Sequence, residues 1–396
     1  MLNIRDDFPY LERIVNGKPI VYFDNAATTQ KPRQVIDRFR DLYTSGIANV
    51  HRAVNFLADE VTEAFEEGRE TVARFIGAQA QEIIFVSNAT QGLNVICSAL
   101  SKRKSLHVLT TTLEHHSNLL PWTQRGKVDF IPWSANGNID LEALIGKLSE
   151  KPDLVSVARA SNFLGTLQPV KEIVRICHEA SVPVLVDASQ SIAHEPHDVR
   201  ELGCDYMVFS GHKIYGPGGT GVLYVRNDVI DTMEPVLLGG SMVKEVHAQT
   251  YTPNDIPYRF EAGTPNIDGV IGLAAALEYV LKLGWQAVMM HEAALVQYAK
   301  AQLADVRGLS MYGPPLGESC APLVPFQVKG LEPGAVAKIL GSRANIVVRS
   351  GFLCAQPAHD QLGIGPTVRV SFGVYNTKDE IDGMVEVLKT IVMINL

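Results

Sequence analysis

The sequence predicts an α/β fold in which a large domain, built on a mostly parallel sheet, is followed by a smaller α+β domain. Two observations support this prediction. Between about residues 80 and 225, short runs of β-branched and aromatic residues alternate with helical patterns, as in parallel sheets with helices on both faces. The chain of 396 residues is also longer than one ordinary core requires, which favours a second domain.

Each predicted element has its own signal. The strands are expected within EIIFVS, LHVLTT, VDFIPW, LVSVARA, VPVLVD, YMVFS and GVLYV. The first predicted helix begins at Thr90 and carries Leu93, Ile96, Cys97 and Leu100 on one face. A second helix is expected over VKEIVRICHEA.

The pattern changes after about residue 265. We expect a long helix, the strand PLVPFQV, a helix near PGAVAKIL, the strands NIVVRS and TVRVSF, and a last helix from Thr377. The predicted division is an N-terminal arm over residues 1–15, a large domain over 16–265 and a smaller domain over 266–396. The segment GPPLGE is expected to be a surface loop.

Composition narrows the class of protein. The net charge is -8 and basic residues are not clustered, so we expect no nucleic-acid partner. The apolar stretch VIGLAAALEYVL is interrupted by Glu278, and charged residues are scattered through MLNIRDDFPYLERIV at the N-terminus. We therefore expect no signal peptide, no membrane anchor and a cytoplasmic location.

The five cysteines are scattered, odd in number and without a CxxC pair. This arrangement predicts neither a disulfide framework nor a metal site. Four of them stand in apolar or helical surroundings, as in LNVICSAL, where a cysteine is usually a small buried side chain. Cys354 differs because it follows a glycine turn and precedes a proline in RSGFLCAQP.

Polar residues follow the apolar strands, at the edge of a parallel sheet where ligands collect. Ser87 ends a strand, and Thr90 is a natural N-cap for the next helix. The N-terminus of that helix suits a phosphate, although capping alone also explains the threonine. Asp187 ends another strand and precedes Gln190; its carboxylate either pairs with a cation such as a protonated pyridine nitrogen or caps a helix.

Two further strand ends carry basic residues. His115 and His116 are adjacent, so at most one faces a given ligand; His115 either stacks on an aromatic cofactor or makes ordinary loop hydrogen bonds. Ser210, His212 and Lys213 follow YMVF. A hydroxyl and an imidazole there suit a phosphate, and the amine suits a Schiff base. A solvated surface lysine is the simpler alternative.

The order of Thr90, His115, Asp187, Gln190 and SGHK resembles the class V, fold-type I enzymes that use pyridoxal 5'-phosphate (PLP). More narrowly, a series of motifs resembles the group II (Suf/Csd-type) cysteine desulfurases almost from end to end: YFDNAATTQKP, ANVHRA, EHHSNLLPW, SNFLGT, VDASQS, FSGHKIYGPGGTGVLY, FEAGTPN and RSGFLCAQP.

The resemblance implies how PLP would be held. Lys213 would carry it as a Schiff base, His115 would stack on its ring, Asp187 would pair with its pyridinium nitrogen and Gln190 would bond its phenolic oxygen. A further set would bind the phosphate, the last of them supplied by the second subunit of a homodimer: Ala89, Thr90, Ser210, His212 and Thr264.

The resemblance also implies the reaction. Asn162 and Arg369 would hold the substrate carboxylate, Arg349 would line the entrance, and Cys354 would be the nucleophile. L-cysteine would become L-alanine, Lys213 would remove the Cα proton, and the sulfur would stay on Cys354 as a persulfide. A protein acceptor would then take it for iron–sulfur cluster assembly or a related pathway. His115 and Arg349 are the candidates to help ionise the thiol.

A few residues depart from the family pattern. Ala89 stands in NATQ where a Gly-Thr-Thr-Glu version is frequent, and Phe352 and Leu353 stand where histidine is common. Arg159 is also unusual, and the sequence gives it no partner. Selenocysteine lyase or another class V reaction remains the alternative, as does an inactive assembly partner. Cys354 argues against the former, and the retention of both Lys213 and Cys354 argues against the latter.

Overall fold

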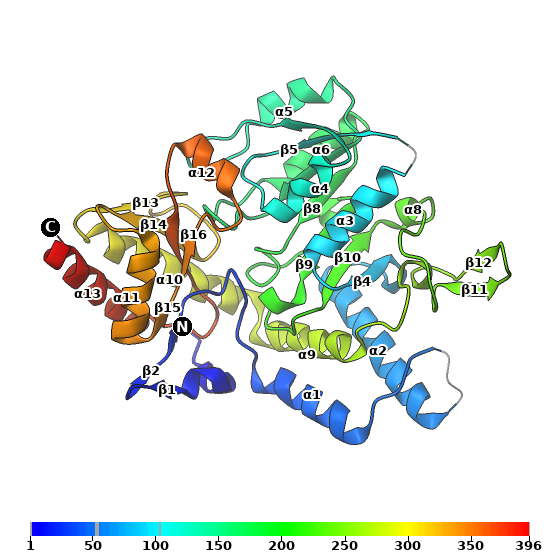
Figure 1. Cartoon of the computed structure of the whole chain (residues 1–396), viewed down its shortest axis with the longest axis horizontal. Helices are drawn as coiled ribbons and strands as arrows, with labels where there is room; N and C mark the ends of the chain where they lie inside the picture. The colour runs from blue at the N-terminus through cyan, green and yellow to red at the C-terminus, as the bar shows by residue number, and fades with distance from the viewer. Residues whose placement is uncertain (1, 52–54, 103, 396) are drawn as a thin grey trace.

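A computed structural model describes residues 2–51, 55–102 and 104–395 of the chain. Figure 1 shows a body built around a large sheet, with a second group of strands and helices beside it that contains the C-terminus. Arg52 and Ala53 of the ANVHRA motif lie outside the described residues. None of the helices in the described ranges has the length and apolar character needed to cross a bilayer.

The large sheet has seven strands in the order β4-β10-β9-β8-β7-β5-β6. All seven predicted strands are confirmed: β4 (Ile83–Val86), β5 (Leu106–Thr110), β6 (Gly126–Phe130), β7 (Leu154–Ala158), β8 (Val184–Asp187), β9 (Tyr206–Ser210) and β10 (Gly221–Val225). Strands β5 to β9 run parallel, whereas β10 is antiparallel to both of its neighbours. The connection from β9 to β10 is too short for a crossover helix, so the chain turns straight back.

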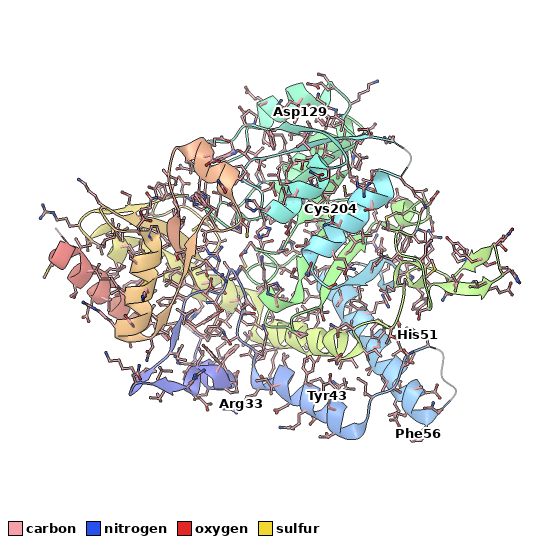
Figure 2. The ribbon with its side chains drawn as sticks, viewed as in Figure 1. Arg33, Tyr43, His51, Phe56, Asp129 and Cys204 are labelled. Atoms are coloured by element: carbon pink, nitrogen blue, oxygen red, sulfur yellow. The ribbon has the colours of Figure 1, made fainter. Side chains whose placement is uncertain are left out.

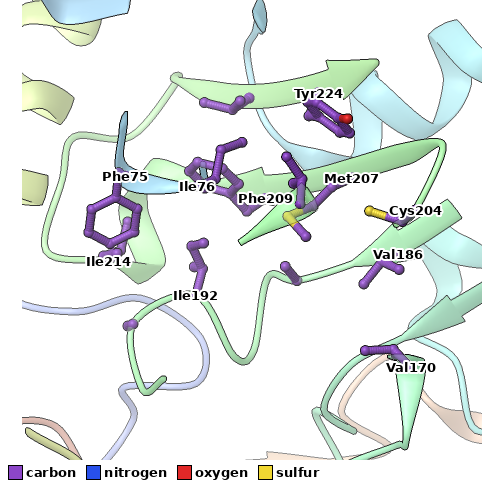
Figure 3. Packing of buried hydrophobic residues seen from close by; sticks show 14 of the residues in the cluster. Phe75, Ile76, Val170, Val186, Ile192, Cys204, Met207, Phe209, Ile214 and Tyr224 are labelled. Atoms are coloured by element: carbon purple, nitrogen blue, oxygen red, sulfur yellow. The ribbon is translucent and has the colours of Figure 1, made fainter. Parts of the chain in front are cut away.

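Both faces of the sheet are buried. Along β8, Val184 and Val186 face one apolar cluster while Leu185 faces another. Figure 3 shows Val186 with Met207 and Phe209 of β9 on the first of these faces. This alternation with burial on both sides is typical of a parallel sheet covered by helices.

The helices of the larger body are α1 (Arg33–Ser45), α2 (Phe56–Phe75), α3 (Ala89–Leu100), α4 (Leu120–Thr123), α5 (Leu141–Leu148), α6 (Val170–Glu179), α7 (Val199–Leu202) and α8 (Asn227–Ile230). The predicted single helix after residue 265 is two helices, α9 (Ile267–Leu283) and α10 (Trp285–Ala304). They are separated by Gly284, whose φ of +82° breaks the helical path.

The second sheet has four strands in the order β13-β14-β17-β16: β13 (Leu309–Met311), β14 (Leu323–Val328), β16 (Arg349–Gly351) and β17 (Thr367–Ser371). An apolar cluster joins it to α10, α11 (Pro333–Ala344) and α13 (Lys378–Asn395). The strand β3 (Val21–Tyr22) pairs with β15 (Ile346–Val347), and Phe23 belongs to the same cluster. Helix α9 packs on α1 and α2. The division into an arm over residues 1–15, a large domain over 16–265 and a smaller domain over 266–396 stays a prediction.

The remaining elements are short: α12 (Gln356–Leu362), the pair β1 (Ile14–Val15) and β2 (Lys18–Pro19), and the hairpin β11 (Val243–Val246) and β12 (Tyr251–Pro253). The hairpin, which the sequence analysis did not predict, projects from the body (Figure 1). The segment GPPLGE forms a loop, as predicted.

Candidate active site

A cavity of about 360 Å³ opens at the carboxyl ends of the parallel strands, and β16 and β17 close its other side. Its volume is typical of a small-molecule site. All of the predicted site residues except Thr264 line it: Ala89, Thr90, His115, Asn162, Asp187, Gln190, Ser210, His212, Lys213, Arg349, Cys354 and Arg369. Thr264 lines a separate hollow with Ser87 and Thr220, so the contribution of Thr264 across a dimer stays a prediction.

Lys213 lies one short 3-10 turn after β9, and its side chain reaches the cavity. Burial of the ammonium lowers its pKa to about 8, against the opposing effect of Asp187. A lysine that loses its proton near neutral pH is a good nucleophile and base. Because the Lys213 side chain lines the cavity and is not exposed, the alternative of a solvated surface lysine is wrong.

The two histidines face different groups. His115 lines the cavity and its Nδ1 accepts a hydrogen bond from the Ser117 backbone N–H at 3.1 Å. Burial, and then the charge of Lys213, lower the pKa of His115 to about 3, so the ring is neutral with its proton on Nε2. His116 instead contacts the cysteine loop, because its backbone N–H donates to the Cys354 carbonyl at 2.8 Å.

Asp187 is buried at the end of β8 and its Oδ1 accepts from the Ser189 backbone N–H at 2.9 Å. Turns follow it, so the alternative of a helix cap is wrong. The side-chain NH2 of Gln190 donates to the Ala26 carbonyl at 2.7 Å, which leaves its second N–H and its amide oxygen for other partners. Ser189, missed by the sequence analysis, also lines the cavity.

The N-terminus of α3 meets the cavity as expected, but its cap is different. The helix begins at Ala89, and Asn88 rather than Thr90 is the N-cap, accepting from the Gln91 backbone N–H at 3.0 Å. The Thr90 hydroxyl is 2.7 Å from that of Ser117. Since Thr90 is released from capping, its hydroxyl can contribute to an anion site at the positive end of the helix dipole.

Ser210 and His212 lie opposite this helix end. The Ser210 hydroxyl accepts from the Ala89 backbone N–H at 2.9 Å, so Ala89 takes part through its backbone and needs no hydroxyl of its own. Burial, then the charges of Lys213 and Lys31, lower the pKa of His212 to about 4. A neutral imidazole there can still donate one hydrogen bond.

An arginine pair is held by Asp24, a residue of the YFDNAATTQKP motif to which no role was assigned. Its carboxylate lies 3.0 Å from Arg349 Nη2 and 3.5 Å from Arg369 Nη2. Arg369 is buried and also donates to the Asn162 carbonyl at 2.7 Å. Its Nε has no hydrogen-bond partner in the described ranges. This N–H can therefore donate a hydrogen bond to a bound ligand.

Cys354 is exposed on a loop with unusual backbone conformation: φ is +55° at Leu353 and +56° at Cys354. Such angles are uncommon outside glycine and are held by the surroundings. The Asn162 side chain donates to the Leu353 carbonyl at 2.6 Å. Phe352 packs edge-on against His359, which stacks on Phe163 at 3.8 Å between ring centroids. The apolar residues before the cysteine thus anchor its loop.

The other cysteines lie away from this chemistry. Burial raises the thiol pKa of Cys97 to about 11 and those of Cys177 and Cys204 to about 12. Figure 3 shows Cys204 among apolar side chains of the core. Cys320 is only partly buried. All five cysteines lie in the described ranges, and among them Cys354 alone is exposed.

One group of possible metal ligands lies among the described residues, formed by His107, Asp129 and Glu150. Figure 2 shows Asp129 at the outer edge of the molecule. Lys127 Nζ already lies 2.6 Å from Asp129 and 2.8 Å from Glu150. The ammonium thus pairs with both carboxylates, and the group is a surface ion-pair network.

Glu114 is buried beside the cavity, and burial raises its pKa to about 7 despite hydrogen bonds from Asn118 at 2.7 Å and Thr111 at 3.1 Å. Because this value exceeds the ordinary 4.5, the folded state holds the extra proton between the two values. The free energy of unfolding should therefore fall as pH rises through that window, by at most about 1.4 kcal/mol per pH unit.

We expect Glu114→Gln to remove this slope in the cofactor-free protein. The free energy of unfolding of the variant minus that of wild type should therefore be larger above pH 7 than below pH 4.5. Urea unfolding of both proteins across the window measures the difference, and a difference that stays constant with pH would contradict the assignment.

The fold and the cavity together define a class of enzyme. A mostly parallel sheet whose strand ends present a lysine, a carboxylate and a helix N-terminus to one cavity is the fold-type I architecture of PLP enzymes. The chain belongs to the aminotransferase class-V family, whose family model matches residues 21–384.

Within that family, the relatives of this chain include cysteine desulfurases. A probable cysteine desulfurase of Mycobacterium leprae is 43% identical over 98% of this chain, which spans only 64% of that protein. One of Halalkalibacterium halodurans is 40% identical, covering 98% of this chain and 96% of the relative. The apo structure of the Thermococcus onnurineus cysteine desulfurase matches with a TM-score of 0.94 and 38% identity, covering 98% of this chain and 97% of that one.

Proposed function

We propose that this chain is a PLP-dependent cysteine desulfurase, which converts L-cysteine to L-alanine and keeps the sulfur on Cys354 as a persulfide. The observation that carries the proposal is the position of the exposed Cys354 on the cavity that also contains Lys213, Asp187 and Arg369. The cysteine desulfurases among its relatives support the same activity.

The residues of the cavity fit PLP. The buried hydroxyl of Ser189 has no hydrogen-bond partner in the described part of the chain, beside a carboxylate that suits a pyridinium nitrogen. Lys213 would hold the aldehyde carbon, Gln190 the phenolic oxygen, and the α3 N-terminus with Ser210 the phosphate. Neutral His115 would stack on the ring. When bound, PLP supplies an electron sink for a carbanion at the substrate Cα.

The protein side chains then have separate tasks. Arg369, with its unpaired Nε, and Asn162 hold the substrate carboxylate, and Arg349 lies beside them at the entrance. Lys213, whose pKa is about 8, removes the Cα proton. The Cys354 thiolate attacks the substrate sulfur: an S–S bond forms, the C–S bond breaks with its electron pair going to Cβ, Cβ takes a proton, and Lys213 returns a proton to Cα. The reaction balances without an external oxidant or reductant.

Exposure of Cys354 also bears on the sulfur acceptor. A persulfide on an exposed loop is open to a thiol of another protein, so we propose a protein acceptor.

A homodimer is proposed as well, because large apolar side chains such as Tyr43 and Phe56, drawn at the edge of Figure 2, are 58% and 76% exposed. A cytoplasmic location and a role in iron–sulfur cluster assembly stay predictions.

Purified protein incubated with L-cysteine and a thiol reductant tests the activity. We expect alanine and sulfide to appear in equal amounts, and pyruvate or no product would contradict a desulfurase. Selenocysteine lyase is the alternative on the same scaffold. Activity on selenocysteine with none on cysteine would favour it.

Arg369→Lys tests the substrate anchor. An ammonium cannot reproduce a planar contact with a carboxylate, so KM for L-cysteine should rise by about tenfold or more. PLP content should stay near that of wild type. Loss of PLP, with normal kinetics in the remaining holoenzyme, would show that Arg369 is not the carboxylate anchor.

A further inference from the structure

Arg159, the residue without a role in the family pattern, stands where two loops of the cavity meet. It follows β7 directly and therefore begins the loop 160–168, which contains Asn162. Its backbone N–H also donates to the Asp187 carbonyl at 2.9 Å. The second loop, 187–195, starts there and carries Asp187, Ser189 and Gln190 into the cavity.

The side chain of Arg159 binds the far ends of the same two loops. Its guanidinium forms a two-point contact with the Glu195 carboxylate, with Nε–Oε1 at 2.5 Å and Nη2–Oε2 at 2.8 Å. Its Nη1 donates to the Gln168 carbonyl. One residue thus contacts the start and the end of both loops.

The contact is sheltered from solvent. The side chains of Arg159 and Glu195 are 22% and 17% exposed, so the ion pair is screened less than a surface pair. A planar guanidinium can satisfy a carboxylate and a carbonyl at once in fixed geometry, whereas a lysine ammonium cannot. The arrangement therefore fixes one loop relative to the other.

We propose that Arg159 is a positioning residue that sets the Asp187–Gln190 turn and the Asn162 loop in register with each other. Through Glu195 it controls the affinity for PLP, and through Gln168 it controls the loop that meets the substrate and, by the Asn162–Leu353 hydrogen bond, the cysteine loop. The inference rests on the proposed function in that the cavity binds PLP and L-cysteine.

The two arms can be tested separately. Arg159→Ala should weaken PLP binding to the cofactor-free protein by about tenfold. Loss of a residue that orients a metal ligand has an effect of this size on metal affinity. It should also weaken L-cysteine binding, measured from the absorbance change of the PLP-loaded protein. Glu195→Ala should weaken PLP binding to the same extent as Arg159→Ala. It should leave the L-cysteine dissociation constant within about twofold of wild type.

Arg175 provides a matched control. It also forms a two-point contact with a carboxylate, that of Glu172, but lies 54% exposed on α6. Arg175→Ala should change neither dissociation constant. The double variant Arg159→Glu with Glu195→Arg should recover PLP affinity relative to Arg159→Glu alone, because it restores the ion pair without restoring the bond to Gln168.

Wild-type affinity for both ligands in Arg159→Ala would overturn the inference. Equal loss of L-cysteine binding in Glu195→Ala would overturn the separation of the two arms. Should Arg159→Ala not fold, Arg159→Lys and Glu195→Ala decide the question by the same measurements. A wild-type protein that fails to bind PLP contradicts the proposed function instead, so the two failures are distinguishable.

Discussion

Replacing Cys354 with serine should abolish alanine formation from L-cysteine, lowering the rate by about 1,000-fold or more, while PLP stays bound. The cofactor and the substrate carboxylate depend on Lys213, Asp187 and Arg369, which the substitution leaves in place. A serine hydroxyl is too weakly acidic to take the sulfur as an anion. Alanine measured by chromatography and PLP measured by absorbance check both parts.

Cys320→Ser is the matched control for this variant. Cys320 is only partly buried and does not line the cavity, so the rate of alanine formation should stay close to that of wild type. Full desulfuration of cysteine by Cys354→Ser would contradict the mechanism and move the protein toward a lyase. Activity of the variant on selenocysteine is compatible with the mechanism, because selenium leaves more easily.

Lys213→Ala should eliminate both covalent retention of PLP and the reaction. The variant has no amine to bond the cofactor and no base at the substrate Cα, and the described lining of the cavity contains no second lysine. In wild type, borohydride reduction followed by peptide mapping should place the cofactor on Lys213. The surface variant Lys127→Gln should keep the label and the activity.

A reduced cofactor found on another lysine would contradict the assignment of the whole cavity. Lys31 is the residue to examine in that case, because burial lowers its pKa to about 8 as well. Its amine donates to the carbonyls of Thr29 and His212 and does not line the cavity, so we expect no label there.

Much of the fold could be predicted because it depends on local patterns. The strands around the cavity are mostly apolar runs, and their polar end residues meet because parallel strands end at one edge. The predicted N-cap of α3, Thr90, was wrong by two positions. Asn88 and Thr90 are both good N-cap residues, and only the backbone conformation decides between them. Gly284 similarly divides a helix that the pattern joined.

The rest of the site depends on contacts between distant residues. Asp24 forms ion pairs with Arg349 and Arg369, which are far away in the sequence. No local sequence pattern predicts these contacts. The partner of Arg159 is likewise distant in sequence. The left-handed conformation at Leu353 and Cys354 is imposed by tertiary packing against the preference of both residues.

The central claim is that the sulfur of L-cysteine is held on Cys354. Mass spectrometry of the protein after brief exposure to L-cysteine, followed by thiol alkylation and peptide mapping, tests it most directly. We predict a gain of one sulfur atom on the peptide containing Cys354, in step with the alanine released. Alanine formed while that peptide stays unchanged, or sulfur gained on another cysteine, would contradict the account.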